Sequence, residues 1–239
     1  MLRAGYGQGN VDPKFGRNAS ECERLGIPFG IYWFSYAYTP EMAAKEALYA
    51  LEAVRPYKMD YPIAFDYEGD SQTTAKKNGV TVTKALVSSL ARAFCGAVQK
   101  AGYYAMVYTN PDYLSRWYDT AIPKEYDIWL AQWPATPDLA AKPAQAGGIW
   151  QYTSSGSVSG ITGRVDMDAA YLDYPALIAA SGLNRPGGQV VPGPEPAKSE
   201  NELARDWVMA ADISDGENPD APATRQQVWT MLYRLTGGK

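Results

Sequence analysis

Apolar residues occur along the chain in two patterns, as short continuous runs and as longer segments in which they recur every three or four residues. Short runs predict strands buried on both faces, and the longer segments predict helices with one apolar face. The first four expected strands are each followed by an expected helix, whereas the last three have few or no helical residues between them. The expected strands cover residues 2–6, 27–34, 62–68, 103–109, 127–133, 148–152 and 163–168.

Capping and turn residues predict where the helices begin and end. Gly26 and Gly102 are expected to end the first and third helices, and the third is expected over residues 83–101. A polar cap followed by proline predicts a helix start at Asp12-Pro13, Thr39-Pro40 and Asn110-Pro111.

Alternation of strands and helices predicts an α/β fold with a parallel sheet and outer helices, either a barrel or a doubly wound sheet. A doubly wound nucleotide-binding sheet has a glycine-rich phosphate turn after a strand. The glycine-rich residues 5–9 lead into Asp12-Pro13 without the spacing of such a turn. The sequence therefore favours an irregular, TIM-like β/α barrel. Such barrels usually have eight strands, and seven are expected here.

The composition changes near residue 183. Four prolines and three glycines between residues 186 and 196 predict a semi-extended linker. Beyond the linker, two short segments have the pattern of amphipathic helices, at residues 203–211 and 224–235. The expected organisation is a barrel over residues 1–182, a linker over 183–198 and a small helical appendage over 199–239.

Composition also excludes several classes of function. The 239 residues carry a formal net charge of −4 and a pI near 5.0, so no basic surface for nucleic acid is expected. Histidine is absent, which excludes Ser-His triads and His-ligated metal sites. No apolar run approaches the roughly 18 residues of a membrane span, and no signal peptide is visible. Acid–base chemistry is therefore expected mainly from carboxylates, Tyr, Lys or Cys, without a cofactor or metal.

Two carboxylates end the strand expected at residues 62–68. Asp66 and Glu68 follow an apolar run, and their i, i+2 spacing puts both side chains on one face of a strand. Active sites of barrels lie at the carboxyl ends of their strands. Two acids there suit glycoside cleavage, because one protonates the leaving oxygen while the other stabilises positive charge. A solvated strand end is the alternative, although paired carboxylates are costly to bury.

Aromatic residues with a polar group are abundant, with 18 Tyr and 7 Trp against 5 Phe. Their flat apolar faces and polar edges suit the binding of sugar rings, and ordinary packing inside a barrel is the alternative. Another acid pair, Asp166 and Asp168, lies on the last expected strand and is a weak signal alone. The aromatic residues at expected strand ends are Tyr32, Trp33, Tyr36, Tyr108, Trp129, Trp133, Trp150 and Tyr152.

Eight motifs, in order along residues 2–177, carry a resemblance to a known family. They are Ala4-Gly5-Tyr6-Gly7, Asp12-Pro13-Lys14-Phe15 with Asn18, residues 26–36, Phe65-Asp66-Tyr67-Glu68, Tyr108-Thr109-Asn110, Trp129-Leu130-Ala131-Gln132-Trp133, Trp150-Gln151-Tyr152 and Val165-Asp166-Met167-Asp168. Together they resemble the family-25 glycoside hydrolases, lysozymes that cut the β-1,4 linkages of N-acetylmuramic acid in peptidoglycan. The resemblance implies a barrel of five β/α units followed by three strands with little helix.

The resemblance also implies roles for single residues. Glu68 matches the general acid, and Asp66 matches the neighbouring acid that stabilises the intermediate or orients the acetamido group. Asp166 matches the acid of the last strand. Family members begin with a further strand that carries an Asp and then a helix, so we expect a barrel that lacks this unit and is open beside its first strand. The residues implied to bind substrate are Tyr32, Tyr36, Tyr108, Trp129, Gln132, Trp150 and Gln151.

The expected function is hydrolysis of peptidoglycan by a lysin or autolysin that acts at the cell wall or outside the cell. The activity of this chain is expected to be doubtful, because the Asp of the family's first strand is lacking. Residues 203–235 resemble part of an S-layer homology module, which implies binding of a secondary cell-wall polymer; a packing appendage is the alternative. Two other functions stay open: a chitinase-like hydrolase and a wall-binding protein whose barrel no longer cuts. Neither nucleic acid nor a membrane is expected as a partner.

Overall fold

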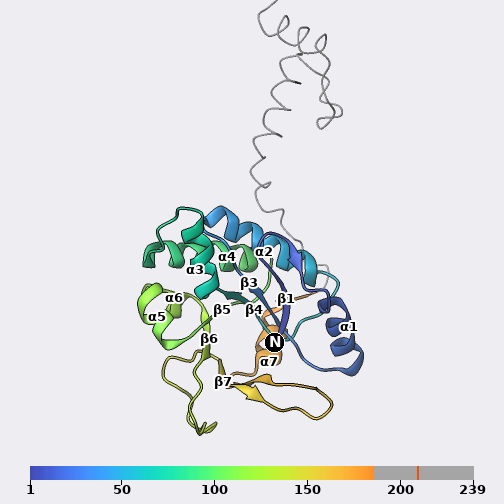
Figure 1. The fold of residues 1–239 in the computed structure, drawn as a ribbon. Helices are drawn as coiled ribbons and strands as arrows, with labels where there is room; N and C mark the ends of the chain where they lie inside the picture. Colours follow the sequence, from blue (N-terminus) through green and yellow to red (C-terminus); the bar gives the residue numbers. More distant parts are fainter. Residues whose placement is uncertain (186–208, 210–239) are drawn as a thin grey trace, which may run out of the picture. The chain divides into compact units, whose positions relative to one another are not determined.

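A curled, eight-stranded sheet forms the centre of the computed structural model, which describes residues 1–185 and Met209 (Figure 1). The order of strands across the sheet is β2-β1-β3-β4-β5-β6-β7-β8. Neighbours from β1 and β3 through to β7 are parallel, whereas β2 and β8 are antiparallel edge strands. The strands are β1 (Leu2–Tyr6), β2 (Asn10–Val11), β3 (Ile31–Phe34), β4 (Ile63–Asp66), β5 (Ala105–Thr109), β6 (Asp127–Ala131), β7 (Ile149–Gly156) and β8 (Val165–Ala170).

The seven expected strands are all present, and the α/β class is confirmed. The expected number was wrong by one, because the two-residue strand β2 pairs with the end of β1 and becomes the edge. Between β1 and β2 the chain reverses at Gly7 and Gly9, whose φ values of 55° and 89° are a conformation that favours glycine. Within the described residues β2 and β8 do not pair with each other, so the sheet is a curled half-barrel and not a closed barrel.

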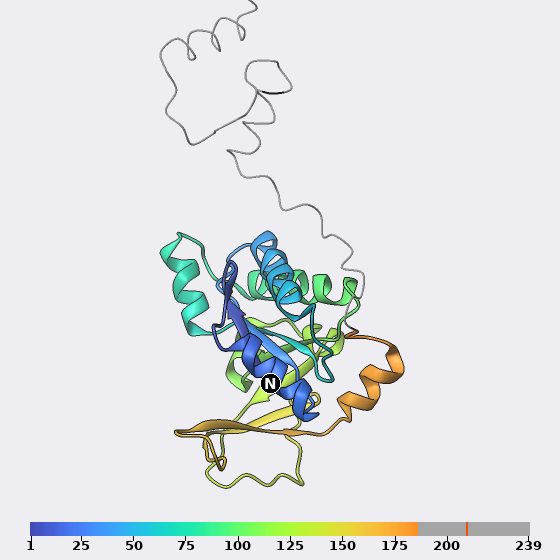
Figure 2. The same ribbon diagram turned by 90° about the vertical axis from the view of Figure 1, so that its right-hand side faces the viewer.

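Seven helices belong to the described part of the chain, and most cover the convex side of the sheet (Figure 2). Thr39 and Asn110 cap the helices that follow them, and Gly26 ends the first helix in the left-handed conformation, as expected. The first helix begins two residues later than expected. The helices are α1 (Phe15–Leu25), α2 (Pro40–Val54), α3 (Gly69–Lys77), α4 (Lys84–Lys100), α5 (Pro111–Trp117), α6 (Ile122–Glu125) and α7 (Tyr174–Ser181).

Alternation along the strands separates two apolar clusters. The outer cluster lies between the sheet and the helices, and includes Trp33, Phe65 and Val107. The inner cluster is much smaller and takes Ala64, Met106, Trp129 and Ile149 from the concave face, with Tyr174 and Ile178 of α7 packed against them. Successive strand residues point to opposite faces, so each strand contributes to both clusters. Helix α7 thus covers part of the concave face, and the rest is left for a site.

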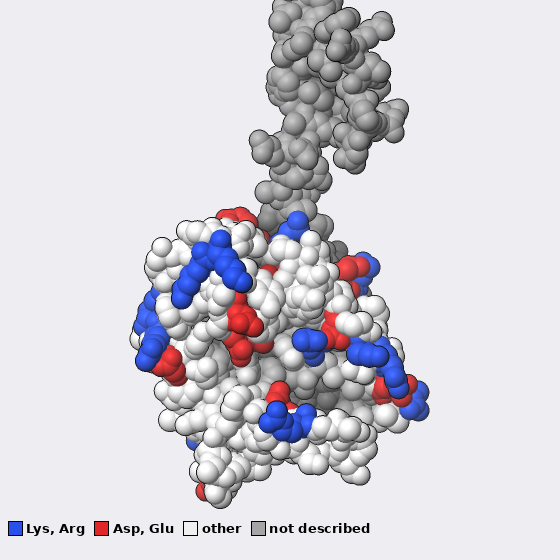
Figure 3. All heavy atoms as spheres, viewed as in Figure 1, with Lys and Arg blue, Asp and Glu red and all other residues white. Residues whose placement is uncertain are grey.

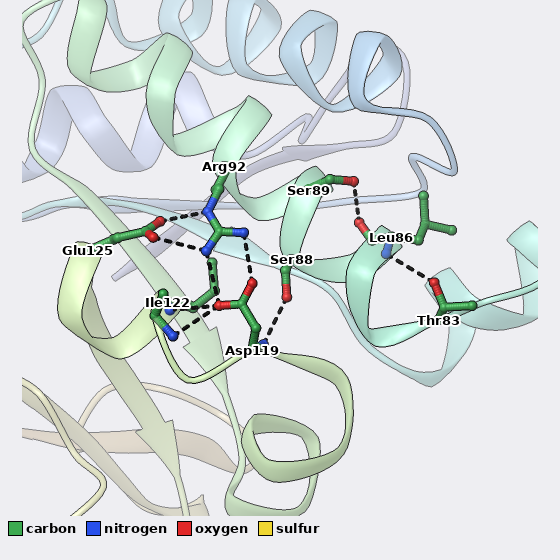
Figure 4. A network of polar contacts seen from close by, with 9 residues as sticks. Thr83, Leu86, Ser88, Ser89, Arg92, Asp119, Ile122 and Glu125 are labelled. Atoms are coloured by element: carbon green, nitrogen blue, oxygen red, sulfur yellow. Dashed lines mark hydrogen bonds and ion pairs between the residues drawn. The ribbon is translucent and has the colours of Figure 1, made fainter.

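Arg92 of α4 fixes the segment that leads into β6 (Figure 4). Its guanidinium donates to Asp119 at 2.8 and 3.0 Å and to Glu125 at 2.7 and 2.9 Å. The backbone N–H of Asp119 also donates to the Ser88 hydroxyl at 2.9 Å. These bonds join helix α4 to the turn and short helix α6 before β6, which carries an aromatic residue of the site described below.

The chain beyond α7 returns to the sheet. Asn184 is buried; its side chain accepts from the backbone N–H of Tyr104 at 2.8 Å and donates to the Tyr61 carbonyl at 2.9 Å. The remainder of the expected linker and the appendage lie outside the described residues, Met209 excepted. In the described part, both cysteines are free thiols, and no helix is long and apolar enough to cross a membrane.

Candidate active site

A row of side chains crosses the concave face where the parallel strands end. Phe34, Asp66, Tyr108 and Trp129 are register partners on the adjacent strands β3, β4, β5 and β6. Register partners point to the same face of a sheet, so these four side chains lie side by side. The backbone N–H of Ser35 donates to the Asp66 carbonyl at 2.7 Å, which extends the pairing to the end of the row.

This row forms one wall of a cleft of about 290 Å³. Acidic side chains gather in the middle of the face shown in Figure 3, beside a hollow and with basic side chains around them. Three of the residues that line the cleft are acids, four are Tyr or Trp, and one is a cation. The lining residues are Arg3, Tyr32, Phe34, Asp66, Glu68, Tyr108, Trp129, Trp133, Gln151, Ser154 and Asp166.

The acids of the cleft differ in burial. Asp66, the last residue of β4, is 5% exposed, and its Oδ1 has no hydrogen-bond partner among the described residues. Burial, and then the charge of Glu68, hold the pKa of Asp66 well above its ordinary value. Glu68 is half-buried at the N-cap of α3, where its backbone N–H donates to the Ser71 hydroxyl at 3.0 Å. Asp166 on β8 is exposed.

The pKa of Glu68 is also raised, first by burial and then by the charges of Asp70 and Asp166. Raised values in both Asp66 and Glu68 mean that the pair holds a proton at a pH at which isolated carboxyls are ionised. The structure thus combines two neighbouring carboxyls with raised pKa values in one cleft, an arrangement that suits general acid catalysis.

Hydrogen bonds orient the aromatic side chains of the cleft. Tyr108 Oη and Trp133 Nε1 both donate to Gln151 Oε1, at 3.1 and 3.2 Å. Trp129 Nε1 donates to Asp168 Oδ1 at 2.7 Å. The Trp129 ring also packs edge-on against Tyr32 and Tyr108, with centroids 6.0 and 4.7 Å away. Burial raises the pKa of Tyr32 to about 12, with a contribution from Asp66, so its hydroxyl keeps its proton at neutral pH.

Seven of the ten residues expected in the site line the cleft: Asp66, Glu68, Asp166, Tyr32, Tyr108, Trp129 and Gln151. Three do not. Trp150 is 3% exposed in the outer cluster, because it alternates with Gln151 along β7, and its Nε1 donates to the Gln132 carbonyl at 2.7 Å. The Gln132 residue is exposed just after β6. Tyr36 packs against Phe34 and Tyr6, with centroids 5.1 and 6.2 Å away.

Four lining residues are outside the substrate-binding set that the resemblance implies: Arg3, Phe34, Trp133 and Ser154. Trp133 is nevertheless one of the strand-end aromatic residues that suit sugar rings. Strand alternation could have found Phe34, which lies two residues after Tyr32 on β3. Alternation along the expected strand 127–133 puts Trp133 on the same face as Trp129, although β6 itself ends at Ala131. Ser154 follows an irregularity in the pairing of β7 with β8, which disturbs alternation. In the part of the chain that the structure describes, no group of three or more His, Cys, Asp or Glu residues could hold a metal ion.

Comparison with protein families shows that residues 1–161 match the model described as "Glycosyl hydrolases family 25". Comparison with curated proteins gives no match. Among solved structures, the CTP1L endolysin is 22% identical with a TM-score of 0.60, over 74% of this chain and 59% of the endolysin. The autolysin LytC from Streptococcus pneumoniae is 28% identical with a TM-score of 0.58, over 71% of this chain and 39% of LytC.

A family 25 glycosyl hydrolase from Bacillus anthracis is 21% identical with a TM-score of 0.56, over 77% of this chain and 81% of that protein. The likenesses to it and to the endolysin show a shared fold. The chain spans less than two thirds of the endolysin and of LytC, so it corresponds to one part of these longer proteins. LytC has also been solved in complex with a synthetic peptidoglycan ligand.

Proposed function

The chain belongs to family 25 of the glycosyl hydrolases, and from this membership we propose that it hydrolyses the β-1,4 linkages of N-acetylmuramic acid in peptidoglycan. The observation that carries the proposal is the pair of acids with raised pKa values, Asp66 and Glu68, in a cleft walled by Tyr and Trp. In this proposal the open sheet corresponds to the family's β/α barrel from its second strand onward. The protein acts at the bacterial cell wall.

Glu68 is the proton donor in this mechanism. It lies half-buried in the cleft wall, and its raised pKa favours the protonated form that can donate to the leaving glycosidic oxygen. Proton transfer leaves Glu68 negatively charged next to the buried Asp66 carboxyl, a state that burial opposes. The positive charge that develops on the sugar offsets this cost, so the two carboxylates stabilise the transition state more than the bound substrate.

Asp66 is the electrostatic partner in this mechanism, and Asp166 is a third acid of the same cleft. In this proposal the buried Asp66 carboxyl holds the acetamido group of the substrate, and the reaction proceeds by substrate assistance with net retention instead of direct attack by Asp66. Asp166 is exposed and lines the same cleft from β8, and its charge contributes to the raised pKa of Glu68. Asp166 therefore keeps the proton on the donor.

Arg3 favours peptidoglycan over chitin as the substrate. It is the only cation among the described residues that line the cleft, beside three acids. Its side chain is 51% exposed and is held by Asp12, with Nη2 and Nε at 2.6 and 2.7 Å from Asp12 Oδ2. Chitin is uncharged, whereas peptidoglycan carries carboxylates on the stem peptides that are attached to its muramic acid. An arginine suits the recognition of such carboxylates.

Two substrates test the proposal. Purified bacterial walls should lose turbidity and release reducing ends with the protein, and soluble chitin oligomers should be cut much more slowly. Faster cleavage of chitin would make the protein a chitinase-like hydrolase. Binding to walls without release of reducing ends would make it a wall-binding protein, and the proposed hydrolysis would be wrong.

We further propose that residues 199–239 bind a secondary cell-wall polymer and that residues 183–198 link them to the catalytic part. The support is the sequence resemblance described above, because these residues lie outside the described structure apart from Met209 and, in the linker, 183–185. A variant ending at Val191 keeps the first compact unit of the chain. It should be pulled down less by intact walls, with unchanged cleavage of soluble glycan fragments. Equal pull-down of both forms would reject the anchoring role.

A further inference from the structure

Gln151 joins three parts of the cleft through one amide group. Its Oε1 accepts hydrogen bonds from Tyr108 Oη on β5, at 3.1 Å, and from Trp133 Nε1 after β6, at 3.2 Å. Gln151 itself lies on β7 and is 3% exposed. A buried side chain with two donors on one oxygen cannot rotate without losing both bonds.

These two bonds determine which end of the amide is which. An indole N–H only donates, so the atom that faces Trp133 must be the amide oxygen. Burial and the charges of Glu68, Asp66 and Asp166 raise the pKa of Tyr108 far above neutral, so its hydroxyl also keeps a proton to donate. The Gln151 Nε2 group donates to no described residue. Because Gln151 lines the cleft, this NH2 is the group that it offers to a ligand.

Trp133 is held in place although it is exposed. Its side chain lines the cleft and is 56% exposed, yet its only polar atom is bonded to the buried Gln151. An exposed indole normally changes rotamer freely, and a ligand that orders it loses binding energy. Here the ring already has a fixed orientation and a free apolar face, which suits the apolar face of a pyranose.

We propose that Tyr108, Gln151 and Trp133 form a preorganised sugar subsite, in which the Trp133 indole stacks on an N-acetylhexosamine ring and the Gln151 NH2 donates to an oxygen of that ring. The inference rests on the proposed glycan hydrolysis and adds the residues that set the position of the sugar relative to Glu68. Trp133 and Gln151 are positioning and specificity residues in it, and take no part in proton transfer.

Three substitutions test the subsite in the full chain. Gln151→Glu keeps an acceptor for Tyr108 and Trp133 but removes the NH2 donor. Gln151→Met removes both functions at similar volume. Trp133→Phe keeps an aromatic face but loses the N–H that orients it. Because the Trp133 side chain is exposed, we expect this variant to fold, and a melting curve checks this. Gln99→Glu is the matched control, because Gln99 is an exposed glutamine of α4 that does not line the cleft.

KM and kcat on soluble peptidoglycan fragments give the readout. We expect Gln151→Met and Trp133→Phe to raise KM by about 10-fold, through the loss of one hydrogen bond or of the fixed orientation of the ring, with kcat changed by less than about 3-fold. Gln151→Glu should raise KM as much, and its added carboxyl in the acidic cleft should also move the pH profile of kcat upward. The Gln99 control should match the parent. An unchanged KM, or a fall confined to kcat, in a parent enzyme that does cut glycan would overturn the subsite alone. A parent that neither cuts nor binds glycan would instead refute the proposed function.

Discussion

The convex, helix-covered face of the sheet and its concave face each bury a carboxyl, Glu46 on the convex side and Asp66 on the concave side. Burial is the main cause of the raised pKa in both groups, and it brings that of Glu46 to about 7. Glu46 lies on α2, where its Oε1 accepts from Gln8 Nε2 and the backbone N–H of Tyr36, both at 3.1 Å. Asp66 has a second acid and an open cleft beside it.

This difference shows that a raised pKa does not by itself identify a catalytic acid. Glu46 has a raised pKa, but no substrate can reach it, because it is fully buried and does not line the cleft. On the concave side Glu68 supplies what Asp66 alone lacks, a half-exposed carboxyl that a substrate can reach. The comparison therefore predicts that substitutions on the two faces affect different quantities, activity on the concave side and folding stability on the convex side.

The largest expected effect is on the concave side. Glu68→Gln keeps the size of the side chain but removes the proton, so we expect kcat on peptidoglycan to fall by about 10²–10⁴-fold. The melting temperature and the binding of glycan should change little, because Glu68 is only half-buried. Release of reducing ends measures the first quantity, and co-sedimentation with walls the second. A Gln variant with parental kcat would mean that another group donates the proton.

A loss of stability without loss of chemistry is expected on the convex side. Phe65 is fully buried next to Asp66 on β4 but points into the outer cluster, where its ring centroid lies 5.2 Å from that of Phe94. Phe65→Ala should lower the free energy of unfolding by about 3–5 kcal/mol. Phe34→Ala is the matched change on the concave face, and because Phe34 is only half-buried it should lower that free energy by less, about 1–2 kcal/mol. Urea titration compares them, and equal losses would remove the distinction between the faces.

The convex face was also the part of the fold that the sequence predicts best. Caps at Thr39 and Asn110 and the terminator Gly26 place helix ends because their chemistry is local. Helix α3 was missed, since its sequence is mostly polar and its N-cap is Glu68, an uncommon cap that was interpreted only as a catalytic acid. Helix α7 has a readable signal, an Asp173 cap before proline, that was overlooked.

The cleft is harder to predict because it is assembled from distant segments. Asp66 and Glu68 follow from the i, i+2 spacing at one strand end. Trp150 was expected beside Gln151, yet neighbours on a strand face opposite ways, and the buried indole of Trp150 belongs to the outer cluster. The bond between Trp133 and Gln151 depends on the loop after β6, whose path no local pattern fixes.

Glu46 offers a pH test of the convex side. Its folded pKa of about 7 lies above the ordinary value, so the folded state binds this proton more tightly than the unfolded state. Its contribution to stability is full below about pH 4.5 and is lost as pH rises through 7. The shift corresponds to roughly 3 kcal/mol as an upper bound. Glu46→Gln should therefore be more stable than the parent at pH 8 and show a smaller fall between pH 5 and 8.

Urea unfolding at several pH values measures this difference between the two forms. Glu52→Gln is the control, because Glu52 lies on the same helix with an exposed side chain paired to Arg55. It should follow the parent at each pH. If Glu46→Gln also kept the parental fall in stability between pH 5 and 8, the Glu46 carboxyl would not be the group that titrates there.

The smallest expected effect concerns Arg3, which separates a charged substrate from a neutral one. Arg3 is half-exposed, so water and salt weaken its attraction for a carboxylate, and exposed pairs contribute at most about 1 kcal/mol. Arg3→Gln should therefore raise KM about 3- to 5-fold on glycan that carries stem peptides, and leave KM on chitin oligomers unchanged. High salt should raise the parental KM on the charged substrate toward that of the variant. Arg24→Gln, which removes an exposed arginine paired with Glu21 outside the cleft, is the control. Equal changes on both substrates would mean that Arg3 supports the cleft through Asp12 rather than by contacting a carboxylate, and the argument for peptidoglycan from this residue would fail.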